Sequence, residues 1–142
     1  MTEQDLVNTA RSVVDAFNDN DWDRLASLLT PDSVYSEVAT QRRLEGVAEI
    51  VRGVQSWKEA MPDAKGTVTN AFANTDKAAL EVTWEGTHTG PLAGPAGTIP
   101  PSGKRHATPS AWVFYFDGDK IKESHNYFDM LAMLQQIGAV PH

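Results

Sequence analysis

The sequence contains no cysteine, which excludes disulfide bonds, thiolate metal sites and cysteine nucleophiles. Basic residues are also scarce, because 12 Lys and Arg stand against 19 Asp and Glu, and the formal net charge is -7. The clusters Arg42-Arg43 and Lys104-Arg105-His106 are too short to form a basic patch. A negative chain without such a patch is not expected to bind nucleic acid or an anionic membrane surface.

Long apolar runs are missing as well. No apolar run approaches the roughly 20 residues of a membrane span, and the stretch MTEQDLVNTA has neither the basic nor the apolar region of a secretion signal. We therefore expect a cytoplasmic protein without a membrane span. The length of 142 residues and the 41% of hydrophobic residues favour one globular domain that covers residues 1–142.

Several catalytic motifs are absent from the chain. There is no GxGxxG or Walker A motif, no GxSxG elbow around a nucleophilic serine, and no HExxH-like pair of histidines with a carboxylate. Dinucleotide binding, triad hydrolysis and metal binding are therefore not expected. A site without metal or cofactor, built from carboxylates and neutral histidines, remains.

Hydrophobic spacing divides the chain into a helical first part and a strand-rich second part. Thr2 and Asp5 have capping-box spacing before a helix that ends near residues 18–20, and Asp21 can cap a short second helix that residues 30–32 stop. A third helix opens at Gly46 and closes at Pro62. Strands are expected at residues 33–38, 67–73, 78–87, 105–116 and 119–128, with a Pro/Gly-rich loop at 88–104 and a last helix that ends at Gly138.

This order of elements predicts an α+β fold in which helices pack on one face of a curved antiparallel sheet. Such a sheet closes into a cone with an apolar pocket. The segment from Ala111 to Phe116, AWVFYF, is apolar on both faces of its strand. One face can meet the helices, and a partner subunit is the simplest cover for the other, so we expect a homodimer.

Three polar residues at the end of the last strand alternate with its other residues. His125, Tyr127 and Asp129 would point to one face, which we expect to be the pocket. Asp129 also precedes the last helix, so its carboxylate is either a general base, an N-cap, or both. His125 is either a functional residue or a hydrogen-bonded core histidine, and Tyr127 is a candidate pocket wall.

Further candidates come from other elements. His88 ends an apolar strand face, which places it at the pocket rim, either as a catalytic group or as an anchor for the following loop. Tyr35 and Glu37 share a strand face and are candidates for substrate binding, although Glu37 points either into the pocket or to solvent. Trp57 and Trp84 are candidate flat walls for a substrate, although aromatic residues at such spacings also serve as plain core.

Six segments carry a family resemblance: AFNDNDWDRLASLLTPDSVY, GVAEIVRGVQSWKEAMPD, WEGTHTGPL, IPPSGKR, FDGDKIKES and YFDMLAMLQQIG. In this order they resemble the SnoaL-like polyketide cyclases, or ester cyclases, of the nuclear-transport-factor-2-like superfamily, over nearly the whole chain. The resemblance implies a cone-shaped, cystatin-like α+β fold, a homodimer, and no metal or cofactor. It also implies that Asp129 is the acid/base of an aldol closure, and that His88 occupies a recurrent family position. His125 replaces a typical tryptophan and makes the pocket more polar.

We therefore expect a cofactor-independent cyclase or isomerase that acts on a hydrophobic, carbonyl-containing small molecule through an enolate. One alternative is a non-catalytic small-molecule binding protein on the same fold. Another is an epoxide hydrolase with an Asp-Arg-Asp set, for which Arg52 and Arg105 are the nearest candidates, although neither has an evident carboxylate pair on the pocket face. The loop at residues 88–104 has the composition of a mobile lid over the pocket.

Overall fold

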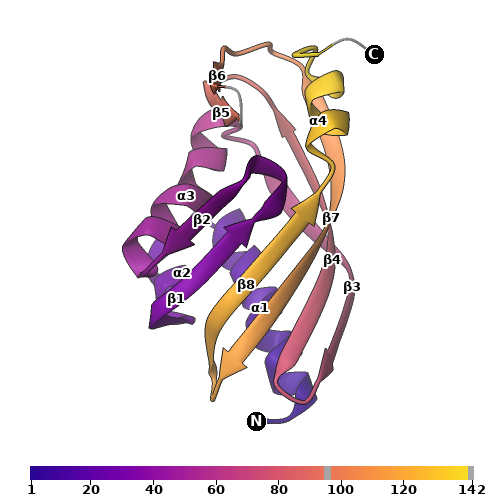
Figure 1. The fold of residues 1–142 in the computed structure, drawn as a ribbon. Helices are drawn as coiled ribbons and strands as arrows, with labels where there is room; N and C mark the ends of the chain where they lie inside the picture. The colour runs from indigo at the N-terminus through magenta and orange to yellow at the C-terminus, as the bar shows by residue number, and fades with distance from the viewer. Residues whose placement is uncertain (95–96, 141–142) are drawn as a thin grey trace.

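A computed structural model describes residues 1–94 and 97–140 of the chain (Figure 1). A six-stranded sheet in the order β2-β1-β8-β7-β4-β3 curves around α1 and α3, which lie on one of its faces, so the α+β prediction is confirmed. The elements are α1 (Glu3–Asn18), α2 (Trp22–Ser27), β1 (Leu29–Glu37), the 3-10 helix η1 (Val38–Thr40), β2 (Arg42–Glu45), α3 (Val47–Ala60), β3 (Lys65–Asn74), β4 (Lys77–Thr87), β5 (Leu92–Gly94), β6 (Gly97–Ile99), β7 (Arg105–Asp117), β8 (Lys120–Phe128) and α4 (Met130–Gln136).

The starts of the helices follow the local sequence. In α1 the Thr2 side chain accepts a hydrogen bond from the Asp5 N–H, and the Asp5 carboxylate accepts one from the Thr2 N–H, so the predicted capping box is confirmed. Asp21 accepts a hydrogen bond from the Arg24 N–H and begins α2. Gly46 precedes α3 with a φ of 88°, a conformation that favours glycine.

Strand β7 forms the centre of the core. Trp112, Phe114 and Phe116 point towards the helices and are buried. Val113 and Tyr115 alternate with them and face away from the helices, so this strand is apolar on both faces, as its sequence predicts. This alternation also decides which residues of β4 and β8 face the core, because both strands pair with β7, β4 over residues 105–115 and β8 over residues 110–117.

The sheet differs from the prediction at its β1 side. Strand β1 pairs with β8 in parallel and with β2 antiparallel, so the sheet is mixed rather than wholly antiparallel. Strand β1 begins at Leu29, four residues before the predicted start of the strand, and includes Pro31, which was predicted to lie between the second helix and the strand. Proline is tolerated there because the β1–β8 pairing shifts register between Leu29 and Val34. The sequence analysis missed η1 and β2.

The predicted loop at residues 88–104 contains a second, two-stranded sheet formed by β5 and β6. The N–H groups of Thr89 and Gly90 donate to the carbonyl of Ala60 at 3.1 and 2.9 Å, which ties the start of this segment to the end of α3. Leu92 in β5 is buried. Residues 95–96 of the predicted loop lie outside the described residues.

No helix within residues 1–94 and 97–140 is long and apolar enough to cross a membrane.

Candidate active site

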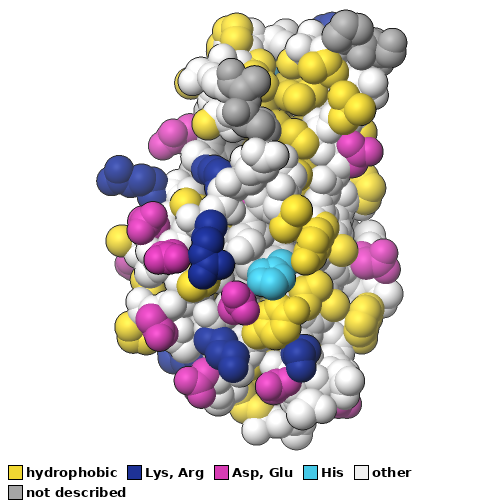
Figure 2. Space-filling model, viewed as in Figure 1, with side chains coloured by type: hydrophobic (Ala, Val, Ile, Leu, Met, Phe, Trp, Pro, Cys, Tyr) yellow, Lys and Arg dark blue, Asp and Glu magenta, His cyan; other side chains and the backbone are white. Residues whose placement is uncertain are grey.

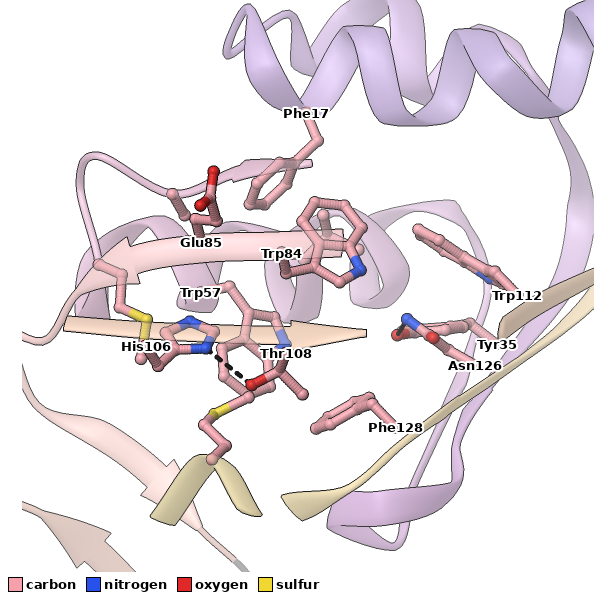
Figure 3. Close-up of a pocket in the computed structure, with 14 residues that line it drawn as sticks. Phe17, Tyr35, Trp57, Trp84, Glu85, His106, Thr108, Trp112, Asn126 and Phe128 are labelled. Carbon is pink, nitrogen blue, oxygen red and sulfur yellow. Dashed lines mark hydrogen bonds between the residues drawn. The ribbon is translucent and has the colours of Figure 1, made fainter. Parts of the chain in front are cut away.

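A cavity of about 60 Å³ lies between the inner face of the sheet and the helices α1, α3 and α4 (Figure 3). Most of its wall is aromatic. The aromatic lining residues are Phe17, Tyr35, Trp57, Trp84, Trp112 and Phe128. Tyr35, Trp57 and Trp84 were predicted from the sequence as ligand-contacting residues, and the structure brings all three together at this cavity.

The aromatic side chains are held in fixed orientations. Trp84 donates its indole N–H to the Ser110 hydroxyl at 2.9 Å and meets the edge of Phe17 with a ring separation of 5.1 Å. Trp57 and Phe128 form a second edge-to-face pair at 5.8 Å. Edge-to-face packing is a favourable arrangement of aromatic rings, so the wall is pre-formed on rigid elements.

A buried carboxylate lies behind this wall. Glu37 at the end of β1 is 1% exposed, so the alternative that it points to solvent is wrong. Its oxygens accept hydrogen bonds from the Tyr35 hydroxyl at 2.8 Å and the Trp57 indole N–H at 2.9 Å. They also accept from the Thr40 hydroxyl at 2.6 Å and from the Arg42 guanidinium at 2.9 and 3.1 Å. Glu37 does not line the cavity itself; it positions two side chains that do.

Arg42 on β2 balances this charge. Its side chain is 25% exposed and also donates to the carbonyl of Gly53 in α3 at 3.3 Å. A carboxylate surrounded only by donors is an anion held in place, with no lone pair left for proton chemistry. Sequence analysis missed Arg42 because this contact depends on the unpredicted strand β2.

Tyr35 and Asn126 connect this network to the cavity. Burial, together with the nearby Glu37 carboxylate, raises the pKa of the Tyr35 phenol well above its usual value, so the hydroxyl stays protonated. The Asn126 amide donates to the Tyr35 oxygen at 3.2 Å. Asn126 is buried, lines the cavity from β8 and was not predicted as a site residue.

His106 and Thr108 line the cavity from β7, on the opposite side from Asn126 in Figure 3. The His106 Nδ1 lies 2.9 Å from the Thr108 hydroxyl. Burial, and to a lesser extent the Arg105 charge, lowers the pKa of His106, so the imidazole is neutral at pH 7. In the sequence His106 was assigned to a short basic cluster. Its place two residues before Thr108 and four before Ser110, on the same strand face, was the signal for the inward face.

The predicted orientation of His125 and Tyr127 is wrong. Asn126 and Phe128 are the β8 residues that line the cavity, so their neighbours point to the other face of the sheet. The His125 ring packs 5.2 Å from that of Tyr115 on this outer face, and Tyr127 is 46% exposed. The sequence analysis used the polar residues of β8 to decide which residues of this strand face the pocket. The pairing of β8 with β7 decides this instead.

Asp129 lies at the start of α4. Its carboxylate accepts the Ala132 N–H at 2.9 Å, which confirms the N-cap alternative. The residue is exposed and does not line the cavity, so the prediction that it faces the pocket is wrong. Its acid/base role remains a prediction.

His88 is fully buried beside the segment it was predicted to border. Its N–H donates to the Lys104 carbonyl at 2.8 Å, its carbonyl accepts the Gly103 N–H at 2.7 Å, and its Nδ1 lies 3.0 Å from the Ser102 hydroxyl. These contacts support the loop-anchor alternative. His88 does not line the cavity, so its predicted place at the rim is wrong.

No group of three or more His, Asp and Glu side chains within the described ranges could hold a metal ion. Arg105 has two carboxylate neighbours, Asp63 at 3.9 Å and Glu85 at 3.8 Å, but neither Arg105 nor Asp63 lines the cavity. All three side chains are more than two-fifths exposed, however, so solvent screens this group. It lacks the burial that would activate a carboxyl group for epoxide opening.

Comparison with known proteins agrees with this architecture. The family model for SnoaL-like polyketide cyclases matches residues 7–137. A structure from Jannaschia sp. CCS1, assigned provisionally as a SnoaL-like polyketide cyclase, is 22% identical with a TM-score of 0.87, covering 98% of this chain and 95% of that one. No curated protein sequence matches the chain.

Two other solved structures are similar. A hypothetical protein from Catenulispora acidiphila DSM 44928 has a ketosteroid isomerase-like fold and was solved with trimethylamine; it is 19% identical, with a TM-score of 0.79 over 94% of this chain and 93% of that one. An LEH-like epoxide hydrolase from M. tuberculosis is 17% identical, with a TM-score of 0.73 over 96% and 92%. At these identities the similarity shows a shared fold, the nuclear-transport-factor-2-like fold.

Proposed function

Because the chain belongs to the SnoaL-like polyketide cyclase family, we propose that it is a cofactor-independent enzyme that isomerises or cyclises a carbonyl-containing small molecule through an enolate. Family membership supports a cyclase or isomerase role in general. The observation that carries the finer proposal is the aromatic cavity, which holds a neutral imidazole, His106, opposite a polar wall formed by Tyr35 and Asn126.

His106 is the best-placed general base in this cavity. A base must be unprotonated at the working pH and must reach the substrate, and a buried imidazole with a lowered pKa meets the first condition. Its position in the cavity wall meets the second. Glu37 is committed to five hydrogen bonds, and the Asp129 carboxylate lies outside the wall.

The proposed reaction conserves every atom of the substrate. His106 removes a proton from the carbon between two carbonyl groups, and the C–H electron pair becomes an enolate. The enolate carbon attacks a second carbonyl carbon of the same molecule, a C–C bond forms, and the π pair moves to oxygen. The resulting alkoxide takes the proton back from the imidazolium, so the product is an isomer of the substrate. Flat aromatic walls would hold the two reacting carbons close together.

The size of the cavity bears on how a substrate enters. A cavity of about 150 Å³ holds one benzene ring, so at 60 Å³ even a single aromatic ring enters only with side-chain movement. Met61 and Met133 are part of the wall. Methionine side chains are flexible and repack readily, so these two residues are the parts of the wall most able to give way.

Two substitutions test the proposal against the family resemblance. His106→Asn keeps a polar group near Thr108 but removes the titratable imidazole, so we expect kcat for closure of an enolisable aromatic carbonyl ester to fall by about 10²–10⁴-fold. Asp129→Asn keeps the helix cap, because asparagine is also a good N-cap residue, and should leave kcat and Tm nearly unchanged. Turnover is followed by chromatographic separation of the substrate from its isomeric product.

The opposite result would contradict the assignment of the base. If Asp129→Asn abolishes turnover with an unchanged Tm while His106→Asn does not, the carboxylate is the base, as the family resemblance implies. The proposed function itself would be wrong if the protein binds such esters in the cavity but turns none of them over. That result would favour the non-catalytic binding protein.

A further inference from the structure

The orientation of the Asn126 amide follows from the network behind it. The Glu37 carboxylate can only accept hydrogen bonds, so the proton of the Tyr35 hydroxyl must point towards it. The Tyr35 oxygen can then only accept, and the group that donates to it from Asn126 at 3.2 Å must be the NH₂. The amide oxygen is left on the other side. This assignment does not depend on distinguishing nitrogen from oxygen by their positions.

Two buried polar atoms in the cavity wall therefore have no protein partner. One is Asn126 Oδ1, an acceptor on a side chain that is 6% exposed; the other is Trp112 Nε1, a donor. Asn126 and Trp112 are opposite each other in the β7–β8 register, and both line the cavity. A buried polar atom without a partner costs free energy, so this wall favours a ligand that can satisfy both atoms.

We infer that Asn126 is a specificity-determining residue that accepts a hydrogen bond from a hydroxyl group of the ligand, and that Trp112 donates to the same polar end. A hydroxyl carries both a proton and lone pairs, whereas a ketone or ether oxygen can only accept. The chemical class of ligand is thus a flat, largely apolar molecule with an alcohol, phenol or enol hydroxyl. The inference rests on the proposed function only in taking this cavity as the substrate site.

The charges around the cavity argue against an anionic ligand, because the charged lining residue is a carboxylate, Glu85. None of the lining residues in the described part of the chain is Lys or Arg. The nearby guanidinium of Arg42 is paired with Glu37, and the Lys58 ammonium donates to the Ala64 carbonyl at 2.9 Å. A carboxylate or phosphate in the cavity would lose its hydration without gaining a cation, which is strongly unfavourable. The hydroxyl compound is therefore not an anion.

A pair of probes of nearly equal shape tests the inference. Phenol carries a hydroxyl where toluene carries a methyl group, and binding of each is measured by calorimetry and by the fluorescence of the cavity tryptophans. We expect phenol to bind roughly tenfold or more tightly than toluene, because an unmet polar group penalises the apolar probe. In Asn126→Leu the acceptor is gone, and the preference should disappear or reverse.

Two further variants keep the test decisive if Asn126→Leu does not fold. Tyr35→Phe frees the amide to rotate, so the preference for phenol should shrink without a change in the Asn126 side chain. Ser124→Ala alters a buried residue on the same face of β8 that does not line the cavity, and it should retain the preference.

Equal binding of phenol and toluene to the wild-type protein would overturn the inference, as would a preference that survives Asn126→Leu. Failure of both probes to bind at millimolar concentration would remove the cavity as a ligand site and overturn it as well. Because these measurements do not use turnover, they separate the two proposals. Lack of a hydroxyl preference with His106-dependent turnover contradicts only the inference, and a preference without any turnover contradicts only the proposed function.

Discussion

Among the residues that the structure describes, folding buries the histidines His88 and His106, and burial is the main cause that lowers the pKa of each imidazole. In the unfolded chain both would titrate near the ordinary value of about 6.5. As the pH falls below that value, the unfolded state binds protons that the folded state resists. The free energy of unfolding therefore decreases as the pH decreases. The contribution of the two neutral histidines to stability is fully present only above about pH 6.5.

At the residue scale we predict that the free energy of unfolding decreases between pH 7.5 and 5.5, by at most about 1.4 kcal/mol per pH unit for each histidine. Urea titrations at several pH values measure this slope. His106→Asn should reduce the slope because only His88 then remains as a buried imidazole. A free energy of unfolding that is constant over this range would show that neither histidine resists protonation.

At the scale of elements, the contact between β3 and β4 fixes one wall of the cavity. A Cβ atom at Gly66 on β3 would lie 2.6–2.9 Å from three carbons of the Trp84 ring. The same glycine is hydrogen-bonded to α1, because the Asn18 side chain donates to the Gly66 carbonyl at 2.9 Å and accepts from the Gly66 N–H at 2.8 Å. The strand can therefore not move away from Trp84 without breaking its bond to the helix.

We predict that Gly66→Ala destabilises the protein by about 1–3 kcal/mol, the usual cost of overpacking a core, and weakens ligand binding because it displaces Trp84. Thermal unfolding measures the first effect and tryptophan fluorescence the second. The matched test is Gly66→Ala combined with Trp84→Leu, in which the added methyl group has room. The double variant should lose less stability than the sum of the two single variants, and simple additivity would contradict the steric explanation.

Sequence patterns predicted the elements that have their own local signals. The helices α1, α2 and α3 have caps and helical spacing, and the β7–β8 hairpin has an Asp-Gly turn. Strands β2, β5 and β6 are three or four residues long and form only through pairing with distant or neighbouring strands, so no pattern within them is long enough to read. The lid role of residues 88–104 remains a prediction, although the start of this segment is bonded to α3.

The site was predicted in part for a similar reason. Trp57 and Trp84 were identified as candidate flat walls and Tyr35 through the strand face that it shares with Glu37, whereas the lining residues Phe17, Trp112 and Phe128 were missed. His106 and Asn126 were missed because their roles depend on strand phase. That phase is set by the partners of β7 and β8 across the sheet, not by the polar residues within each strand.

At the scale of the whole molecule, the outer face of the sheet carries exposed apolar side chains. Hydrophobic residues gather over β7 and β8 on this face (Figure 2). Phe72 and Tyr127 are 58% and 46% exposed, and Val113 and Tyr115 lie on the same face of the sheet. A contiguous apolar surface of this kind favours association with another protein surface.

We predict a homodimer that uses this outer face. A second copy presents the same apolar strands, so the two copies can form a closed two-fold symmetric dimer. Sedimentation equilibrium at micromolar concentration should give twice the chain mass of 15.5 kDa. Tyr115→Glu replaces an apolar ring by a charge in the interface and should shift the protein to monomer while leaving the cavity intact. A monomeric wild-type protein at these concentrations would contradict the prediction.

The parallel pairing of β1 with β8 has a consequence for the synthesis of the chain. The Asn126–Tyr35 bond that crosses this pair joins residues 91 positions apart. At about 5–20 residues per second, a ribosome needs roughly 5 to 20 s to translate the intervening segment. Until then β1 has backbone groups on one side that no nascent strand can pair. The exposed residues Pro31 and Asp32 lie where β1 leaves its register, and such residues protect an unpaired strand from pairing with neighbouring chains while the ribosome completes β8.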